Sequence, residues 1–200
     1  ADKVAINTEA IKNIDFIKRA SKKFGSQCIV ASLEIKKNTN SFEPWYDYGR
    51  ERSGKNLKNW CEELLNSGVG EIFLSSVDRD GTGEGFNLEL IEEVYEISDV
   101  PIVVCSGAGK KSDVLDLLKK FKCDGVCIGS LFHYNYIKKI NSKFMSYDSD
   151  TLRMGKQIDS GNIDFIKSGY GGYKDIQVEH CSIKDLKNYL KNNGIQIREL

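Results

Sequence analysis

The sequence lacks an excess of charge of either sign, a long hydrophobic run and a signal peptide. Its 29 basic and 29 acidic residues cancel, so the chain has no broad field that would collect nucleic acid or attach it to an acidic membrane. We therefore expect neither nucleic acid nor membrane partners, and any phosphate ligand needs local contacts. With no run of about 18 apolar residues, the sequence predicts a cytoplasmic protein in a reducing compartment.

The sequence also lacks a disulfide framework and a metal motif. Most of the six cysteines lie in apolar runs such as CIVASL (28–33), where a cysteine behaves as a small core residue. The CDGVC segment (123–127) has the wrong spacing for a zinc knuckle. His133 and His180 are isolated in the sequence, and neither is expected to be catalytic. We expect no metal and no cofactor.

What the sequence does contain is an alternation of short apolar runs with segments of helical period. Five such alternations predict an α/β protein with a parallel sheet covered by helices. The pattern by itself leaves two architectures open, a doubly wound sheet and a (β/α)8 barrel that would need three more units. The predicted strands span 3–7, 28–35, 71–77, 101–106 and 125–132, and the predicted helices span 9–23, 55–67, 87–98, the segment around 114–121, and 182–194.

Two stretches interrupt this alternation. Residues 38–54 form a polar connection. Residues 136–181 are too long for an ordinary βα connection and too aromatic for a simple linker. We interpret residues 136–181 as an inserted lobe or lid within a single domain that spans residues 1–200.

Polar residues and glycines gather where the predicted strands end. In a parallel sheet these carboxyl ends share one edge, where ligands bind. The segment SSVDRDGTGEGF (75–86) changes from a strand to a glycine-rich turn, with Asp78, Arg79 and Asp80 at the change. Charged side chains are least costly where a strand leaves the sheet and water enters. This segment therefore predicts the mouth of a site.

Two of these strand ends suit a phosphate group. Gly107, Gly109 and Gly129 allow backbone N–H groups to approach an anion, and Ser130 adds a hydroxyl. Each glycine alone is better explained by a tight turn. Their occurrence after two successive strands favours phosphate binding.

Two carboxylates are candidates for acid–base chemistry. Glu34 ends an apolar strand, where an unpaired buried carboxylate would be costly, so we expect it to face the mouth with Asp80. Two carboxylates across a cleft divide acid and base roles when their environments separate their pKa values. The alternative is an ion pair of Glu34 with Lys36 or Arg79.

Several segments together resemble the cyclase subunit of imidazole glycerol phosphate synthase, the HisF family. The resemblance runs in order over residues 1–135 and again over 182–198. The combination of DRDGT (78–82) with SGAGK (106–110) is specific. Other matching segments are ADKVAINTEA (1–10), FGSQCIVASLEIKK (24–37), GSLFHYN (129–135) and LKNYLKNNGIQIR (186–198).

The resemblance implies a (β/α)8 TIM barrel, of which this chain would hold about the last five βα units, truncated at the N-terminus. It also implies an enzyme, a cyclase-type lyase of histidine biosynthesis that takes ammonia from a glutaminase partner subunit. Ammonia and a phosphoribulosyl-aminoimidazole carboxamide nucleotide would give imidazole glycerol phosphate and an aminoimidazole carboxamide ribotide. This substrate carries a phosphate at each end, so two phosphate sites are implied.

Residue by residue, Asn7 and Thr8 match one phosphate site. Ser75 matches a threonine inside the barrel near the substrate, and Asp80 lies beside a phosphoribosyl end. The second phosphate site is matched by Gly81, Gly107, Gly129 and Ser130, and we include Ser106 with them.

The opposite end of the barrel carries the ammonia entrance in this family. Lys3 and Glu71 match the charged residues that gate this entrance, and Asp2 matches a position that faces the partner. The resemblance therefore predicts a glutaminase interface at the amino-terminal ends of the strands.

The sequence departs from the family in three respects. The family's catalytic pair is two aspartates, of which one belongs to a strand absent here and the other matches Glu34, a glutamate. Ser106 stands where the family has a glycine close to phosphate. Residues 136–181 interrupt the usual short join before the final helix. The last two departures resemble a paralogous, HisF-like branch associated with surface-sugar amidation.

Three hypotheses follow from these departures. The first is the histidine-pathway cyclase, with Glu34 and Asp80 as catalytic residues. The second is an ammonia-delivering partner of a surface-sugar amidotransferase. The third is an inactive fragment or scaffold.

Overall fold

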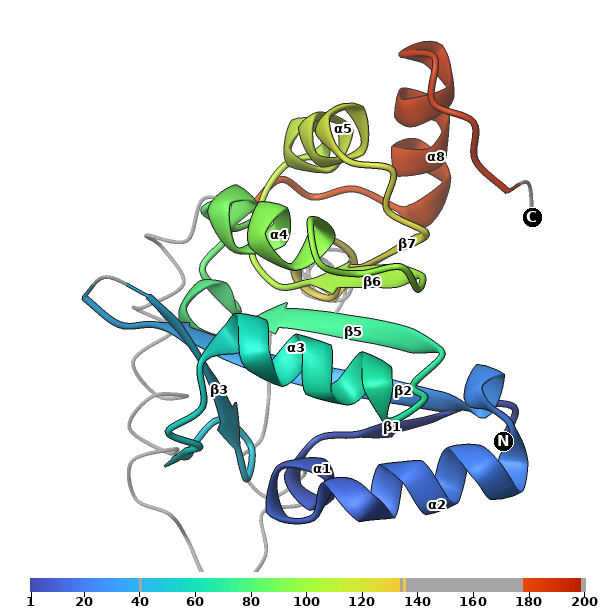
Figure 1. Ribbon diagram of the computed structural model, residues 1–200. Coiled ribbons are helices and arrows are strands. Elements are labelled where there is room, and N and C mark those ends of the chain that lie inside the picture. Colours follow the sequence, from blue (N-terminus) through green and yellow to red (C-terminus); the bar gives the residue numbers. More distant parts are fainter. Residues whose placement is uncertain (40, 134, 136–177, 199–200) are drawn as a thin grey trace, which may run out of the picture.

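The computed structural model describes residues 1–39, 41–133, 135 and 178–198. These residues form a mostly parallel sheet with helices packed along it (Figure 1). The strands are β1 (Val4–Ile6), β2 (Ile29–Lys37), β3 (Phe42–Tyr46), β4 (Glu51–Arg52), β5 (Glu71–Ser76), β6 (Ile102–Cys105) and β7 (Gly125–Cys127). The helices are α1 (Thr8–Lys12), α2 (Ile14–Phe24), α3 (Leu57–Asn66), α4 (Leu88–Tyr95), α5 (Lys111–Lys120) and α8 (Ile183–Asn192).

The parallel strands lie side by side in the order in which the chain makes them. β1 pairs with β2, β2 with β5, β5 with β6, and β6 with β7, all in parallel. A doubly wound sheet reverses its strand order at a switch point, and the described strands contain no such reversal. This order is that of a β/α barrel, and the α/β class expected from the sequence is confirmed.

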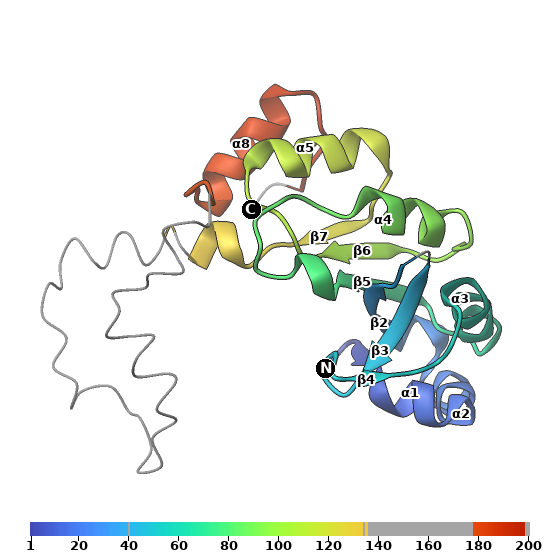
Figure 2. The ribbon, with the colours of Figure 1, turned by 90° about the vertical axis from the view of Figure 1, so that its left-hand side faces the viewer.

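The two faces of the sheet differ in polarity because side chains alternate along each strand. In β2, Ala31, Leu33 and Ile35 are almost fully buried, and the helices lie on that face (Figure 2). Ser32 and Glu34 point to the opposite face and are only partly buried. The same alternation in β5 and β6 leaves one face apolar against the helices and the other partly polar.

The core lies between the sheet and the helices. Its largest fully buried side chains come from both layers, so each amphipathic helix covers the apolar face of a neighbouring strand. They include Trp60, Leu64, Ile72, Leu74, Leu90, Ile91 and Leu117.

The predicted polar connection of residues 38–54 is in fact a β-hairpin. β3 pairs antiparallel with β2, so that Glu34 lies opposite Trp45, and β4 pairs antiparallel with β3. The turn uses left-handed backbone at Asp47, Tyr48 and Gly49. The hairpin was missed because Pro44 lies within β3, and proline ordinarily argues against a strand.

Two further expectations need correction. The helix predicted over 9–23 is interrupted at Asn13, whose extended backbone separates α1 from α2. The strand predicted over 125–132 ends at Cys127, and the chain is helical from Ser130. Gly129 stands between the two, and its carbonyl accepts a hydrogen bond from the N–H of His133.

The inserted lobe proposed for residues 136–181 lies almost wholly outside the described residues. Among the cysteines, Cys61 and Cys181 are buried as expected for core residues, whereas Cys127 is exposed. In the part of the chain that the structure describes, every helix is too short or too polar to cross a membrane.

Candidate active site

The carboxyl ends of β2, β5 and β6 bring the central candidate residues together. Glu34 of β2 is the register partner of Ser75 of β5, and Ser75 is the partner of Cys105 of β6. Ser106 follows Cys105 directly. Because register partners in a sheet present their side chains on the same face, Glu34 and Ser75 are neighbours on the partly polar face.

Hydrogen bonds extend this cluster to the loop after β5. The hydroxyl oxygens of Ser75 and Ser106 are 2.8 Å apart, and the Ser106 hydroxyl donates to Asp80 Oδ1 at 3.2 Å. Glu34, Ser75, Ser106 and Asp80 thus form one continuous group across the neighbouring ends of β2, β5 and β6. The two carboxylates expected at the mouth lie at its two ends.

The three charges of residues 78–80 have separate partners. Asp78 accepts a hydrogen bond from the backbone N–H of Lys37 at 2.6 Å, which holds the loop against the end of β2. Arg79 forms an ion pair with Glu84 at 2.8 Å. Asp80 is therefore the member of this set whose carboxylate turns toward the strand ends.

Glu34 lies in a partly desolvated position. Burial raises the pKa of its carboxyl, and the nearby Gly49 backbone offsets part of that rise. Its Oε2 atom is buried without a hydrogen-bond partner among the described residues. An acid with a raised pKa can hold a proton at a higher pH, which suits proton transfer.

The ion pair considered as an alternative for Glu34 is not formed within the described residues. Lys36 donates to the carbonyl of Gly49 at 2.7 Å and lies 3.8 Å from the centre of the Trp45 ring. Arg79 is engaged by Glu84. The carboxylate of Glu34 is therefore available to a ligand or to water.

The end of β1 is tied to the β3–β4 hairpin. Asn7 donates through Nδ2 to the carbonyl of Trp45 at 3.1 Å, and Thr8 accepts from the N–H of Asp47 at 3.0 Å. Asn7 Oδ1 and Trp45 Nε1 are buried without partners among the described residues. Trp45 was missed from the sequence because it lies in the hairpin taken for an irregular connection.

The glycines near the second expected phosphate site differ in how closely other atoms surround them. A Cβ at Gly107 would lie 2.3 Å from the carbonyl oxygen of Gly85, and Gly107 has φ of 106°, so only glycine fits. Gly81 and Gly129 have open space around them. The N–H groups of Gly109 and Lys110 already donate to Asp113, at 2.9 and 2.8 Å. Gly109 therefore offers no donor to an anion.

Ser106 has a backbone conformation that is unusual for its residue type. Its φ is 77°, in the left-handed region, and the residue is 6% exposed. L-residues other than asparagine and aspartate rarely adopt this region because of a clash with Cβ. Such a conformation is one that glycine, the residue implied here by the HisF resemblance, adopts without this clash.

At the amino-terminal edge of the sheet, Lys3 forms an ion pair with Glu71. Lys3 precedes β1 and Glu71 begins β5, so the pair lies at the other end of the strands from Glu34 and Asp80. Glu71 is four register positions from Glu34 and Ser75, which is about 13 Å along the strands. The side chain of Glu71 is largely buried and that of Lys3 is half exposed. Asp2 is exposed at the same edge.

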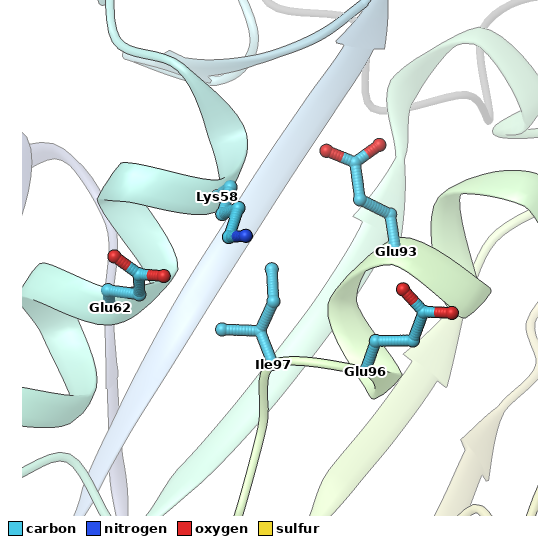
Figure 3. A pocket seen from close by; sticks show the side chains of 5 residues that line it. All are labelled: Lys58, Glu62, Glu93, Glu96 and Ile97. Atoms are coloured by element: carbon cyan, nitrogen blue, oxygen red, sulfur yellow. The ribbon is translucent and has the colours of Figure 1, made fainter.

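A hollow of about 410 Å³ lies elsewhere, between α3 and α4 on the helical layer (Figure 3). It is lined by Lys58, Glu62, Glu93, Glu96 and Ile97. Desolvation, with Glu89 and Glu96 nearby, raises the pKa of Glu93. These side chains come from α3, α4 and the two residues after α4, whereas Glu34 and Ser75 lie on the opposite, partly polar face of the sheet, so the hollow is not part of the candidate site. No group of three or more potential metal ligands occurs among the described residues.

Comparisons with known proteins agree with the resemblance. A family model described as "Histidine biosynthesis protein" matches residues 1–138. The imidazole glycerol phosphate synthase subunit HisF of Lactococcus lactis subsp. cremoris (strain MG1363) is 41% identical over 136 residues, which are 67% of this chain and 52% of that protein. HisF of Streptococcus sanguinis is 38% identical over 146 residues, 72% of this chain and 57% of that protein.

One relative aligns with nearly the whole chain. HisF of Natranaerobius thermophilus is 29% identical over 198 residues, 99% of this chain and 61% of that protein. The chain thus spans about half the length of the curated relatives it matches. Because the family model covers more than half of a chain whose parallel strands follow barrel order, this chain belongs to the histidine biosynthesis protein family, as the HisF resemblance indicated.

Proposed function

We propose that the protein containing this chain is the cyclase of an imidazole glycerol phosphate synthase. It uses ammonia to convert a phosphoribulosyl-aminoimidazole carboxamide nucleotide into imidazole glycerol phosphate and an aminoimidazole carboxamide ribotide. The observation that carries the proposal is the group of Glu34, Ser75, Ser106 and Asp80 at the carboxyl ends of adjacent parallel strands. The names of the relatives favour this activity over the surface-sugar branch.

Glu34 and Asp80 carry the proton transfers in this proposal. Ring closure and cleavage require a proton to be removed at one position and supplied at another. Burial raises the pKa of Glu34, whereas Asp80 is exposed on its turn. Carboxyls in such different surroundings can divide the acid and base roles.

The two phosphates of the substrate bind at the two sides of this pair. On one side, Asn7 and Thr8 lie at the carboxyl end of β1, where α1 begins. The second phosphate is held by the loops after β5, β6 and β7, through Gly81, Gly107, Gly129 and Ser130. Open space at Gly81 and Gly129 supports an approach of the ligand to the backbone there.

Ammonia enters from the opposite edge of the sheet, where a glutaminase subunit binds. The Lys3–Glu71 ion pair lies at that edge, and Asp2 is exposed beside it for the partner. Ammonia would pass along the partly polar face, which carries Ser32, Glu34 and Ser75 from one end of the strands toward the other. The remaining length of the relatives is proposed to supply the strands that close the barrel around this path.

The test compares ammonia with glutamine as nitrogen source in the full-length protein. Asp80→Asn should reduce turnover with either source by at least about 100-fold, as loss of a proton-transfer group does. Lys3→Ala should lower turnover with glutamine plus glutaminase while ammonia-dependent turnover stays near the wild-type value. Wild-type protein that forms no imidazole glycerol phosphate from ammonia would refute the proposal.

A further inference from the structure

Ser106 keeps a conformation that glycine would adopt with less strain. Its φ is 77°, and among the described residues other than glycine only Asp47 and Tyr48, in the hairpin turn, also have a positive φ. Unlike those turn residues, Ser106 is buried, so the strain is held by the surrounding structure. Backbone strain of this kind at a strand end points to a role for the side chain that requires it.

The side chain has a defined hydrogen-bonding direction. A serine hydroxyl can donate one hydrogen bond, and the Ser106 hydroxyl donates to Oδ1 of the Asp80 carboxylate. In the 2.8 Å contact with Ser75, Ser106 must then accept, and Ser75 donates. The result is an ordered relay from Ser75 through Ser106 to Asp80.

The Asp80 carboxylate depends on this hydrogen bond for its orientation, because the turn that carries Asp80 constrains it little. The residue is exposed, and its neighbours Gly81 and Gly83 both have positive φ in a glycine-rich loop. Among the described residues, the Ser106 hydroxyl is the side-chain partner of the Asp80 carboxylate. The carboxylate is thus fixed to β6 by one hydrogen bond from a buried donor.

We propose that Ser106 is a positioning residue for Asp80: its left-handed backbone places the hydroxyl so that the relay fixes the carboxylate toward the strand ends. The inference rests on the catalytic role of Asp80 in the proposed function. It differs from a phosphate-binding role for Ser106, because the hydroxyl is engaged by Ser75 and Asp80.

Two substitutions in the full-length protein separate the hydroxyl from the backbone. Ser106→Ala removes the hydroxyl and keeps the strain, whereas Ser106→Gly removes both. Both variants should lower kcat by about tenfold, because a misplaced catalytic group loses much of its rate advantage, with KM within twofold of wild type. Ser106→Gly should unfold at a higher temperature than Ser106→Ala. Ser76→Ala is the matched control, because it removes a buried, unpartnered hydroxyl on the other face, and its kcat should equal the wild-type value.

A second readout does not depend on turnover. The ¹³Cγ signal of Asp80 reports hydrogen bonding to its carboxylate, so it should move in both Ser106 variants and stay in place in Ser76→Ala. An unmoved Asp80 signal with unchanged kcat would overturn the inference, and a KM that rises tenfold at constant kcat would replace it with phosphate binding. If the wild-type protein has no ammonia-dependent turnover, the proposed function fails, and the Asp80 signal alone decides whether Ser106 positions this carboxylate.

Discussion

Arg52 donates to Glu43 across the β3–β4 hairpin, with 2.7 Å between Nη2 and Oε2. Glu43 is 4% exposed and also accepts hydrogen bonds from Asn38 and from the N–H of Gly54. These donors, Arg52 first, lower the pKa of Glu43 to about 2. The hairpin that carries Trp45 to the candidate site is therefore closed around a buried carboxylate.

This arrangement predicts acid sensitivity of the hairpin. The folded-state pKa of about 2 lies below the ordinary 4.5, so the stabilisation is complete above about pH 4.5 and is lost as pH falls toward 2. Glu43→Gln should cost about 2 kcal/mol at pH 7, as loss of charged hydrogen bonds does. Urea unfolding at pH 7, 5 and 3 should show that the difference in free energy of unfolding between wild type and Glu43→Gln becomes smaller as the pH falls. Glu51→Gln, an exposed carboxylate on the same hairpin, is the control, and a gap that is constant with pH would contradict the prediction.

Gly107→Ala should destabilise the protein by about 2 kcal/mol. The new Cβ would meet the Gly85 carbonyl at 2.3 Å and would sit on a backbone with φ of 106°. Gly129→Ala is the matched control, because no atom lies within 4 Å of its Cβ, and it should change stability by less than about 0.5 kcal/mol. Thermal or urea unfolding measures both. Equal stability of the two variants would mean that the Gly85–Gly107 contact relaxes freely.

Substitution of Glu34 tests its chemistry. Glu34→Asp should retain or raise ammonia-dependent turnover, because it restores the side-chain length that the HisF resemblance implies, whereas Glu34→Gln should lower this turnover by removing the ionisable group. Burial raises the pKa of Glu34 above its ordinary value of 4.5. A change of kcat with pH that follows the ionisation of Glu34 should therefore be centred above pH 4.5 in wild type and be absent in Glu34→Gln. Equal turnover in all three forms would make Glu34 structural.

Phosphate binding is predicted at the loops after β6 and β7. Titration with glycerol phosphate should shift the backbone amide signals of Gly107, Gly129 and Ser130, since N–H groups at successive strand ends bind an anion without net positive charge. The amide of Gly109 should shift little, because it donates to Asp113. Shifts at Gly109 without shifts at the other three would count against this site.

The sequence by itself determined the class of the fold and the edge of the sheet at which the candidate residues lie. Alternation along β2 assigns Ala31, Leu33 and Ile35 to the helix-covered face and Glu34 to the other, because side chains in a strand alternate with a period of two. Apolar runs separated by helical periods predicted the parallel strands, and their polar ends located the candidate residues.

Only the tertiary structure decided which strands are neighbours and what each polar group contacts. Period-two alternation is the same in a doubly wound sheet and in a barrel, so strand order required the observed pairing. The β3–β4 hairpin depends on donors to Glu43 from Asn38, Arg52 and Gly54. The Lys3–Glu71 pair and the Ser75–Ser106–Asp80 relay join residues 68, 31 and 26 positions apart. Hydrogen bonds act over about 3 Å, so contacts between residues so far apart along the chain exist only once folding has placed the strand ends side by side.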